Sequence, residues 1–187
     1  MYHSLGYSHT PSRAEEIGKY VSETGATVRA AAGRFGVSKS TVHKDLTIRL
    51  KVQNRTLYEQ VQAVLKTNKE ERQLSESLFR ESDIYNKFHN AACNETIRIS
   101  SDDWEMLRIK IDECYKGFSS RLRSIHPISN MEMRICLLLK INISVTGISM
   151  LCGRSKSAIV SARKRLYEKY FAEKGKPEQW DEFILSL

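Results

Sequence analysis

Residues 27–50 have the sequence TVRAAAGRFGVSKSTVHKDLTIRL, which predicts two short helices joined by a tight turn. Gly36 stands where a left-handed helix end requires a residue without a Cβ atom, and the Ser38 hydroxyl is suited to cap the next helix. The apolar residues expected to face the core recur every four residues: Val42, Leu46 and Leu50. This pattern predicts a helix-turn-helix.

The polar side chains of the second helix lie on its other faces. A short helix with such a surface is suited to the major groove of DNA, with its N-terminal turns at the base edges. The residues predicted to contact DNA are Lys39, Ser40, Thr41, His43, Lys44 and Thr47. Arg29, in the preceding helix, is expected to hold a phosphate. The alternative from the pattern alone is an ordinary helical hairpin with a solvated basic face.

Residues 13–72 resemble the stage III sporulation protein D family of transcription factors. The stretches that carry the resemblance are IGKYV (17–21), TVRAAA (27–32) and FGVSKSTVHKDL (35–46). The resemblance implies a small helix-turn-helix DNA-binding domain that activates or represses genes, with residues 39–47 in the major groove. The basic tail that follows the last helix of that family is replaced here by ERQLSESLF (71–79).

An internal repeat predicts a second helix-turn-helix within residues 144–171. GVSKSTV (36–42) recurs as GRSKSAI (153–159), at a constant offset of 117 residues. Both copies place a glycine at the turn, a serine at the cap and a lysine in the first helical turn. The side chains of the second copy expected to face away from the core and contact DNA are Lys156, Ser157, Ser161, Arg163 and Lys164.

Residues 82–187 resemble the C-terminal DNA-binding region of Bacteroides-type regulators, many of which carry tetratricopeptide repeats ahead of it. The matching stretches are SDIYNKFH (82–89), DDWEMLRIKIDECYKGF (102–118), MRICLLLKI (133–141), GRSKSAIVSARKRLYEKYF (153–171) and WDEFILSL (180–187). The resemblance implies a LuxR-like helix-turn-helix whose second helix enters the major groove. Gly147 departs from the pattern, because a glycine inside a helix costs about 1 kcal/mol relative to alanine.

Charge is concentrated on the two predicted motifs. The chain has 187 residues and a net charge of +8, which indicates a polyanionic partner. Residues 13–72 hold 12 basic and 7 acidic side chains, and residues 134–174 hold 9 and 2. The intervening residues 73–133 hold 8 basic and 10 acidic side chains. This distribution is typical of two surfaces that bind nucleic acid.

The sequence predicts no catalytic site, no metal site and no cofactor. It contains no P-loop, no G-x-S-x-G and no H-E-x-x-H motif. None of the four cysteines forms a C-x-x-C pair, and no histidine lies at ligand spacing. Cys136 and Cys152 are expected to be small core residues.

The sequence also predicts an intracellular protein. The first residues, MYHSLGYSHTPS, lack the apolar core of a signal peptide. No apolar run approaches the roughly 20 residues that span a bilayer. The expected location is therefore the cytoplasm, associated with the nucleoid and without membrane contact.

The predicted fold is all-α, with two small helical bundles, each containing a helix-turn-helix, joined by a helical linker. The expected segments are a disordered lead-in (1–12), an N-terminal domain (13–72), a linker (73–81) and a C-terminal domain (82–187). At the linker two alternatives compete: the preceding helix continues past Arg72, or Ser82 caps a new helix. A break within 73–82 is favoured.

The last segment, PEQWDEFILSL (177–187), places apolar residues at i, i+3, i+4 and i+7. That stripe requires a partner surface. The two candidates are the core of its own domain and a second subunit, in a homodimer formed through the C-terminal helix.

These features predict a sequence-specific transcriptional regulator that binds double-stranded DNA. The alternative is a protein-interaction adaptor or a sigma-factor-like component, in which one or both motifs do not contact DNA and a surface binds RNA polymerase or another regulator. Strong salt dependence of binding is expected for a DNA-binding protein and not for an adaptor.

Overall fold

A computed structural model describes residues 10–187, and within them helices are the only regular secondary structure. The all-α prediction is therefore confirmed. Residues 1–9 of the predicted lead-in lie outside the described residues. The chain forms two compact units, and the boundary between them follows Leu74. Among the described residues, no helix combines the length and apolar character that a membrane crossing requires.

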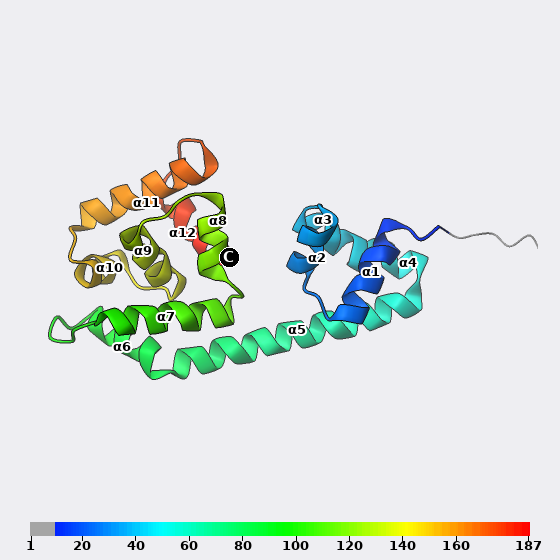
Figure 1. Ribbon diagram of the computed structural model, residues 1–187, viewed down its shortest axis with the longest axis horizontal. Helices are drawn as coiled ribbons and strands as arrows, with labels where there is room; N and C mark the ends of the chain where they lie inside the picture. The colour runs from blue at the N-terminus through cyan, green and yellow to red at the C-terminus, as the bar shows by residue number, and fades with distance from the viewer. Residues whose placement is uncertain (1–9) are drawn as a thin grey trace, which may run out of the picture. The chain divides into compact units, whose positions relative to one another are not determined.

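The first unit is a small helical bundle (Figure 1). Its elements are α1 (Arg13–Thr24), α2 (Val28–Phe35), α3 (Lys39–Lys44), the π-helical turn η1 (Asp45–Arg49), α4 (Leu50–Gln53) and the first part of α5 (Arg55–Glu81). Its buried core consists of Ile17, Val21, Ala31, Val42, Leu46, Leu50 and Val61. Because α1 contacts α2, η1 and α4, this core holds the predicted motif in place.

The π-helical turn widens the helix that follows the tight turn. The Leu50 N–H donates to the Asp45 carbonyl, five residues back. In a regular α-helix, positions four residues apart drift around the axis by about 40° at each step. The wider turn offsets part of this drift. Val42, Leu46 and Leu50 can therefore all be fully buried, as their spacing predicts.

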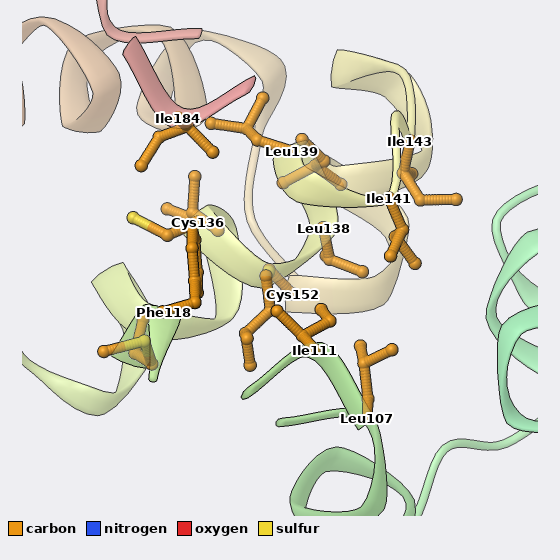
Figure 2. Close-up of a cluster of buried hydrophobic side chains, with 14 of the residues drawn as sticks. Leu107, Ile111, Phe118, Cys136, Leu138, Leu139, Ile141, Ile143, Cys152 and Ile184 are labelled. Carbon is orange, nitrogen blue, oxygen red and sulfur yellow. The ribbon is translucent and has the colours of Figure 1, made fainter. Parts of the chain in front are cut away.

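The helices of the second unit pack around one central apolar helix. Its elements are the last part of α5, α6 (Asp83–Ala91), α7 (Ser101–Cys114), α8 (Phe118–Ile125), α9 (Asn130–Lys140), α10 (Val145–Cys152), α11 (Lys156–Phe171) and α12 (Pro177–Ser186). The central α9 contacts α7, α10, α11 and α12. Figure 2 shows Cys136, Leu138 and Leu139 of this helix among buried side chains of its neighbours.

Serine caps set the start of several helices in both units. Ser100 and Asp103 form a capping box at α7, and Ser129 and Glu132 form one at α9. Each serine side chain accepts a hydrogen bond from the backbone of the third helical residue, which satisfies an N–H that has no partner inside the helix.

The break between helices lies at Ser82, within the range 73–82 predicted for it, although the preceding helix is longer than expected. The helix expected to end near Arg72 runs on to Glu81 as α5. Ser82 then accepts a hydrogen bond from the Tyr85 N–H and starts α6. The two alternatives therefore both occur: the preceding helix continues past Arg72, and Ser82 caps a new helix.

The apolar stripe of α12 packs on its own unit. Trp180 and Ile184 are fully buried, and Phe183 and Leu187 pack against the same core. The buried Lys140 of α9 donates to the Leu185 carbonyl, 3.1 Å away, and its ammonium lies 4.0 Å from the centre of the Tyr115 ring. Of the two surfaces considered for this stripe, the one observed is the core of its own domain.

Gly147 is explained by packing rather than by a weak helix. It lies in α10, where a Cβ atom would stand 2.7 Å from Ile143 Cγ2 and 2.8 Å from Ala92 Cβ. Real Cβ atoms do not approach this closely, so a larger residue would push α10 away from its neighbours. The departure from the expected pattern thus has a steric cause.

Candidate nucleic-acid interface

The turn between α2 and α3 has the geometry that its sequence predicts. Gly36 is left-handed, with φ of 62°, and the Val37 N–H donates to the Ala32 carbonyl at 3.1 Å. Ser38 Oγ accepts a hydrogen bond from the Thr41 N–H at 3.1 Å. This turn fixes the direction of α3 relative to α2.

The outer face of α3 is polar and exposed. Lys39, Ser40, His43 and Lys44 are exposed and Thr41 is half-buried, as is Thr47 of the following η1. Two threonine hydroxyls already have partners, because Thr41 Oγ1 lies 2.8 Å from Ser38 Oγ and Thr47 Oγ1 donates to the His43 carbonyl at 2.7 Å. Most of the side chains predicted for this surface are thus accessible together on one short helix.

Two arginines flank this helix and share one buried carboxylate. Arg13 of α1 donates from Nε to Asp45 Oδ2 at 2.8 Å, and Arg49 pairs with the other carboxylate oxygen. Burial by itself raises the pKa of Asp45. The hydrogen bonds from the two arginines lower it by more, so the pKa lies below its ordinary value. The cluster ties α1 to the end of the α3 helix. Only half of this cluster is visible in the sequence, as the i, i+4 spacing of Asp45 and Arg49.

Arginines also lie on α2. Arg29 is exposed, at the start of α2. Arg34, near its end, places its guanidinium carbon 5.1 Å from the centre of the Tyr20 ring. A cation over an aromatic face is held in a preferred orientation. Arg34 therefore has a structural partner in α1.

The second copy of the motif repeats this local geometry. Gly153 is left-handed, with φ of 59°, and Ser155 Oγ accepts a hydrogen bond from the Ala158 N–H at 3.2 Å. A further serine contact recurs, since the Ser38–Ser40 hydroxyl pair of the first copy (2.9 Å) corresponds to Ser155–Ser157 (3.0 Å). The two turns are therefore built in the same way.

The outer face of α11 carries four of the five predicted side chains. Lys156, Ser157, Ser161 and Lys164 are exposed. Lys164 lies 3.9 Å from Glu168, a distance typical of a weak surface ion pair. These residues follow one another along the first turns of the helix, as the corresponding residues do on α3.

Arg163 is a correction to the predicted site. Its expected position on the outer face is wrong, because the residue is only 3% exposed. Its Nε donates to Asp181 Oδ1 of α12 at 2.8 Å, and its Nη2 binds the other carboxylate oxygen. The repeat itself held the signal: at the offset of 117 residues Arg163 corresponds to Leu46, which faces the core.

No other chemistry is apparent at these surfaces. Within residues 10–187, no group of three or more histidine, cysteine or acidic side chains is arranged to hold a metal ion. Cys136 and Cys152 are buried, as predicted. Burial raises the pKa of Cys152 to about 11, so its thiol is protonated and unreactive at neutral pH.

Comparison with known proteins agrees with the first motif. A family model described as stage III sporulation protein D matches residues 7–78. Over 68 residues the chain is 48% identical to stage III sporulation protein D of Bacillus subtilis strain 168, an alignment that covers 36% of this chain and 73% of that protein. No solved structure matches the chain.

The basic helical surface and the family match together define a class, that of DNA-binding regulators of transcription rather than enzymes. Within that class, the chain belongs to the stage III sporulation protein D family. The match ends four residues past Leu74, where the first compact unit ends.

Proposed function

We propose that the chain is a sequence-specific regulator that inserts α3 into the major groove of double-stranded DNA. The observation that carries the proposal is the exposed face of α3, which begins at the capped turn and lies in the region matched by the family. The proposed DNA contacts are Lys39, Ser40, Thr41, His43, Lys44 and Thr47, with Arg29 on a phosphate.

The chemistry of these side chains suits the two kinds of contact that such a helix makes. A lysine ammonium binds guanine O6 and N7 in the major groove or a phosphate oxygen, and serine and threonine hydroxyls bond either base edges or phosphates. Ser38 holds the first turn of α3 in helical form, so the positions of Lys39 and Ser40 are set before DNA arrives. Preorganisation of this kind lowers the entropy cost of binding.

We further propose that α11 forms a second DNA-binding surface, through Lys156, Ser157, Ser161 and Lys164. Support comes from the repeated turn geometry and from the excess of basic residues in 134–174. The resemblance of residues 82–187 to LuxR-like regions favours the same role. Arg163 is left out, because its side chain is buried against Asp181.

The experiment compares two lysines of the first unit, Lys44 and Lys66. Lys66 is also exposed, but it lies on α5 and approaches Glu70 at 3.8 Å. If Lys44 contacts a base, Lys44→Ala weakens specific binding by about 1–3 kcal/mol; if it contacts a phosphate, the salt slope falls by about one. Lys66→Ala is expected to change neither quantity.

Unchanged affinity and salt slope for a folded Lys44→Ala protein would remove this residue from the interface. If neither α3 nor α11 variants altered binding, and the wild type bound DNA only weakly, the adaptor or sigma-factor-like alternative would be favoured. That alternative predicts a stable protein partner, such as RNA polymerase or another regulator, and no salt-dependent affinity for duplex DNA.

A further inference from the structure

The offset of 117 residues allows α3 and α11 to be compared position by position. The turn glycines, the cap serines and the first buried β-branched residues coincide, and Val42 is 0% exposed where Ile159 is 1% exposed. One helical turn further on, the buried Leu46 corresponds to the buried Arg163. Since the inward positions agree, the outward positions of the two helices can also be paired.

Val160 is an outward residue at which a large apolar side chain replaces a polar one. It corresponds to the exposed His43 and is 40% exposed. Its neighbours on the helix surface, three and four residues away, include the exposed Lys156, Ser157 and Lys164. Between Lys156 and Lys164, all of which the structure describes, it is the one large apolar side chain that is exposed.

Neither helix stability nor the core accounts for a valine here. A β-branched residue is a weaker helix former than alanine or lysine, because its side chain loses rotamer freedom against the preceding turn. The core side of α11 is already filled by Ile159, Leu166 and Tyr167, which are buried. Val160 therefore presents an apolar group at the centre of an otherwise polar and basic surface.

The major groove contains one apolar group that fits such a side chain. Thymine presents its C5-methyl group there, next to the O4 acceptor, whereas the other groups on base-pair edges are mainly hydrogen-bond donors or acceptors. Ser157 and Lys164 lie on the same face as Val160 and supply donors for acceptors beside that methyl group.

We infer that Val160 is a specificity-determining residue that contacts a thymine methyl group when α11 binds DNA. The inference rests on the second surface proposed above. Under this inference the two surfaces prefer different bases, because His43 places a polar ring at the corresponding position of α3. The two motifs of this chain would then recognise unlike half-sites rather than a repeated sequence.

The test uses the full chain and a duplex selected by it from a random pool. Each thymine of the duplex is replaced in turn by deoxyuridine, which lacks only the C5-methyl group. At one position the wild type is expected to lose about fourfold in affinity, as estimated for the burial of one methyl group. Val160→Ala is expected to bind the thymine duplex several-fold more weakly and to be insensitive to deoxyuridine at that position.

Two further variants separate the possible failures. Val52→Ala makes the same substitution at another exposed valine, in α4, and is expected to keep the wild-type response to deoxyuridine. If Lys164→Ala weakens binding but Val160→Ala keeps the deoxyuridine penalty, the assignment of Val160 is overturned while the second surface stands. If Lys164→Ala changes neither affinity nor the selected motif, the second surface itself is overturned, and this inference with it. Circular dichroism checks that each variant is folded.

Discussion

Arg163 of α11 donates a hydrogen bond to Asp181 of α12 over 2.8 Å, and this partly buried pair joins the predicted recognition helix to the C-terminal helix. Burial raises the pKa of Asp181, while the hydrogen bond from Arg163 lowers it, and the balance lies above the ordinary value. The pair thus has a structural role at a position where the repeat would place a leucine.

Removing only the arginine should destabilise the second unit. Arg163→Ala leaves Asp181 without its cation in a partly buried site. Loss of one partner costs about 3–5 kcal/mol in a fully buried pair, and less is expected here because the Asp181 side chain is 26% exposed. Replacing both residues by leucine should cost less, because no uncompensated charge remains. Urea unfolding followed by tryptophan fluorescence measures this, since Trp104 and Trp180 both lie in the second unit. A folded double variant whose DNA binding has a salt slope lower by one would show instead that Arg163 contacts a phosphate.

The stability of the first unit should depend on pH through Asp45. Its pKa is lower in the folded protein than in the unfolded chain, so the carboxylate contributes stability above the unfolded value. That contribution is lost as the pH falls through the folded pKa, below about pH 4. Asp45→Asn should therefore destabilise the unit at pH 7, with a difference from wild type that shrinks towards pH 3.

Amide hydrogen exchange across α1 and α3 reports on this unit separately. Glu59→Gln is the control, because Glu59 pairs with Arg55 on an exposed face of α5 and both side chains are mostly accessible. It should leave the pH dependence unchanged. A constant difference between wild type and Asp45→Asn from pH 7 to pH 3 would contradict the role given to the Asp45 carboxylate.

Two glycine-to-alanine substitutions should have opposite effects. At Gly147 the added methyl group would collide with Ile143 and Ala92, so overpacking by about 1–3 kcal/mol should exceed the gain in helix propensity. At Gly33, inside α2, a Cβ atom would meet nothing within 4 Å. Gly33→Ala should therefore stabilise the first unit by up to about 1 kcal/mol. Thermal unfolding of both variants measures the signs, and a stabilising Gly147→Ala would refute the steric explanation.

Local sequence signals predicted much of the fold. Serine caps and turn glycines act through neighbouring backbone groups, so their effects are visible within a few residues. Ser38 and Ser155 cap the helices for which they were predicted, and Gly36 and Gly153 adopt the left-handed conformation.

The features that were missed depend on residues distant in sequence. The burial of Arg163 requires Asp181, 18 residues later, and the cluster around Asp45 requires Arg13, 32 residues earlier. The π-helical turn begins at Asp45, which binds Arg13 of α1, and no local sequence pattern predicts it. Val160 differs from these residues, because the residue type alone does not distinguish an exposed valine from a core valine.

Selection of bound duplexes from a random-sequence pool at physiological salt, with the full chain, tests the central claim most directly. The account predicts one motif made of two unlike blocks, of which Lys44→Ala weakens one and Lys164→Ala the other. Recovery of no motif, with weak binding that disappears as the salt concentration rises, would contradict it, since only non-specific attraction to phosphates would remain.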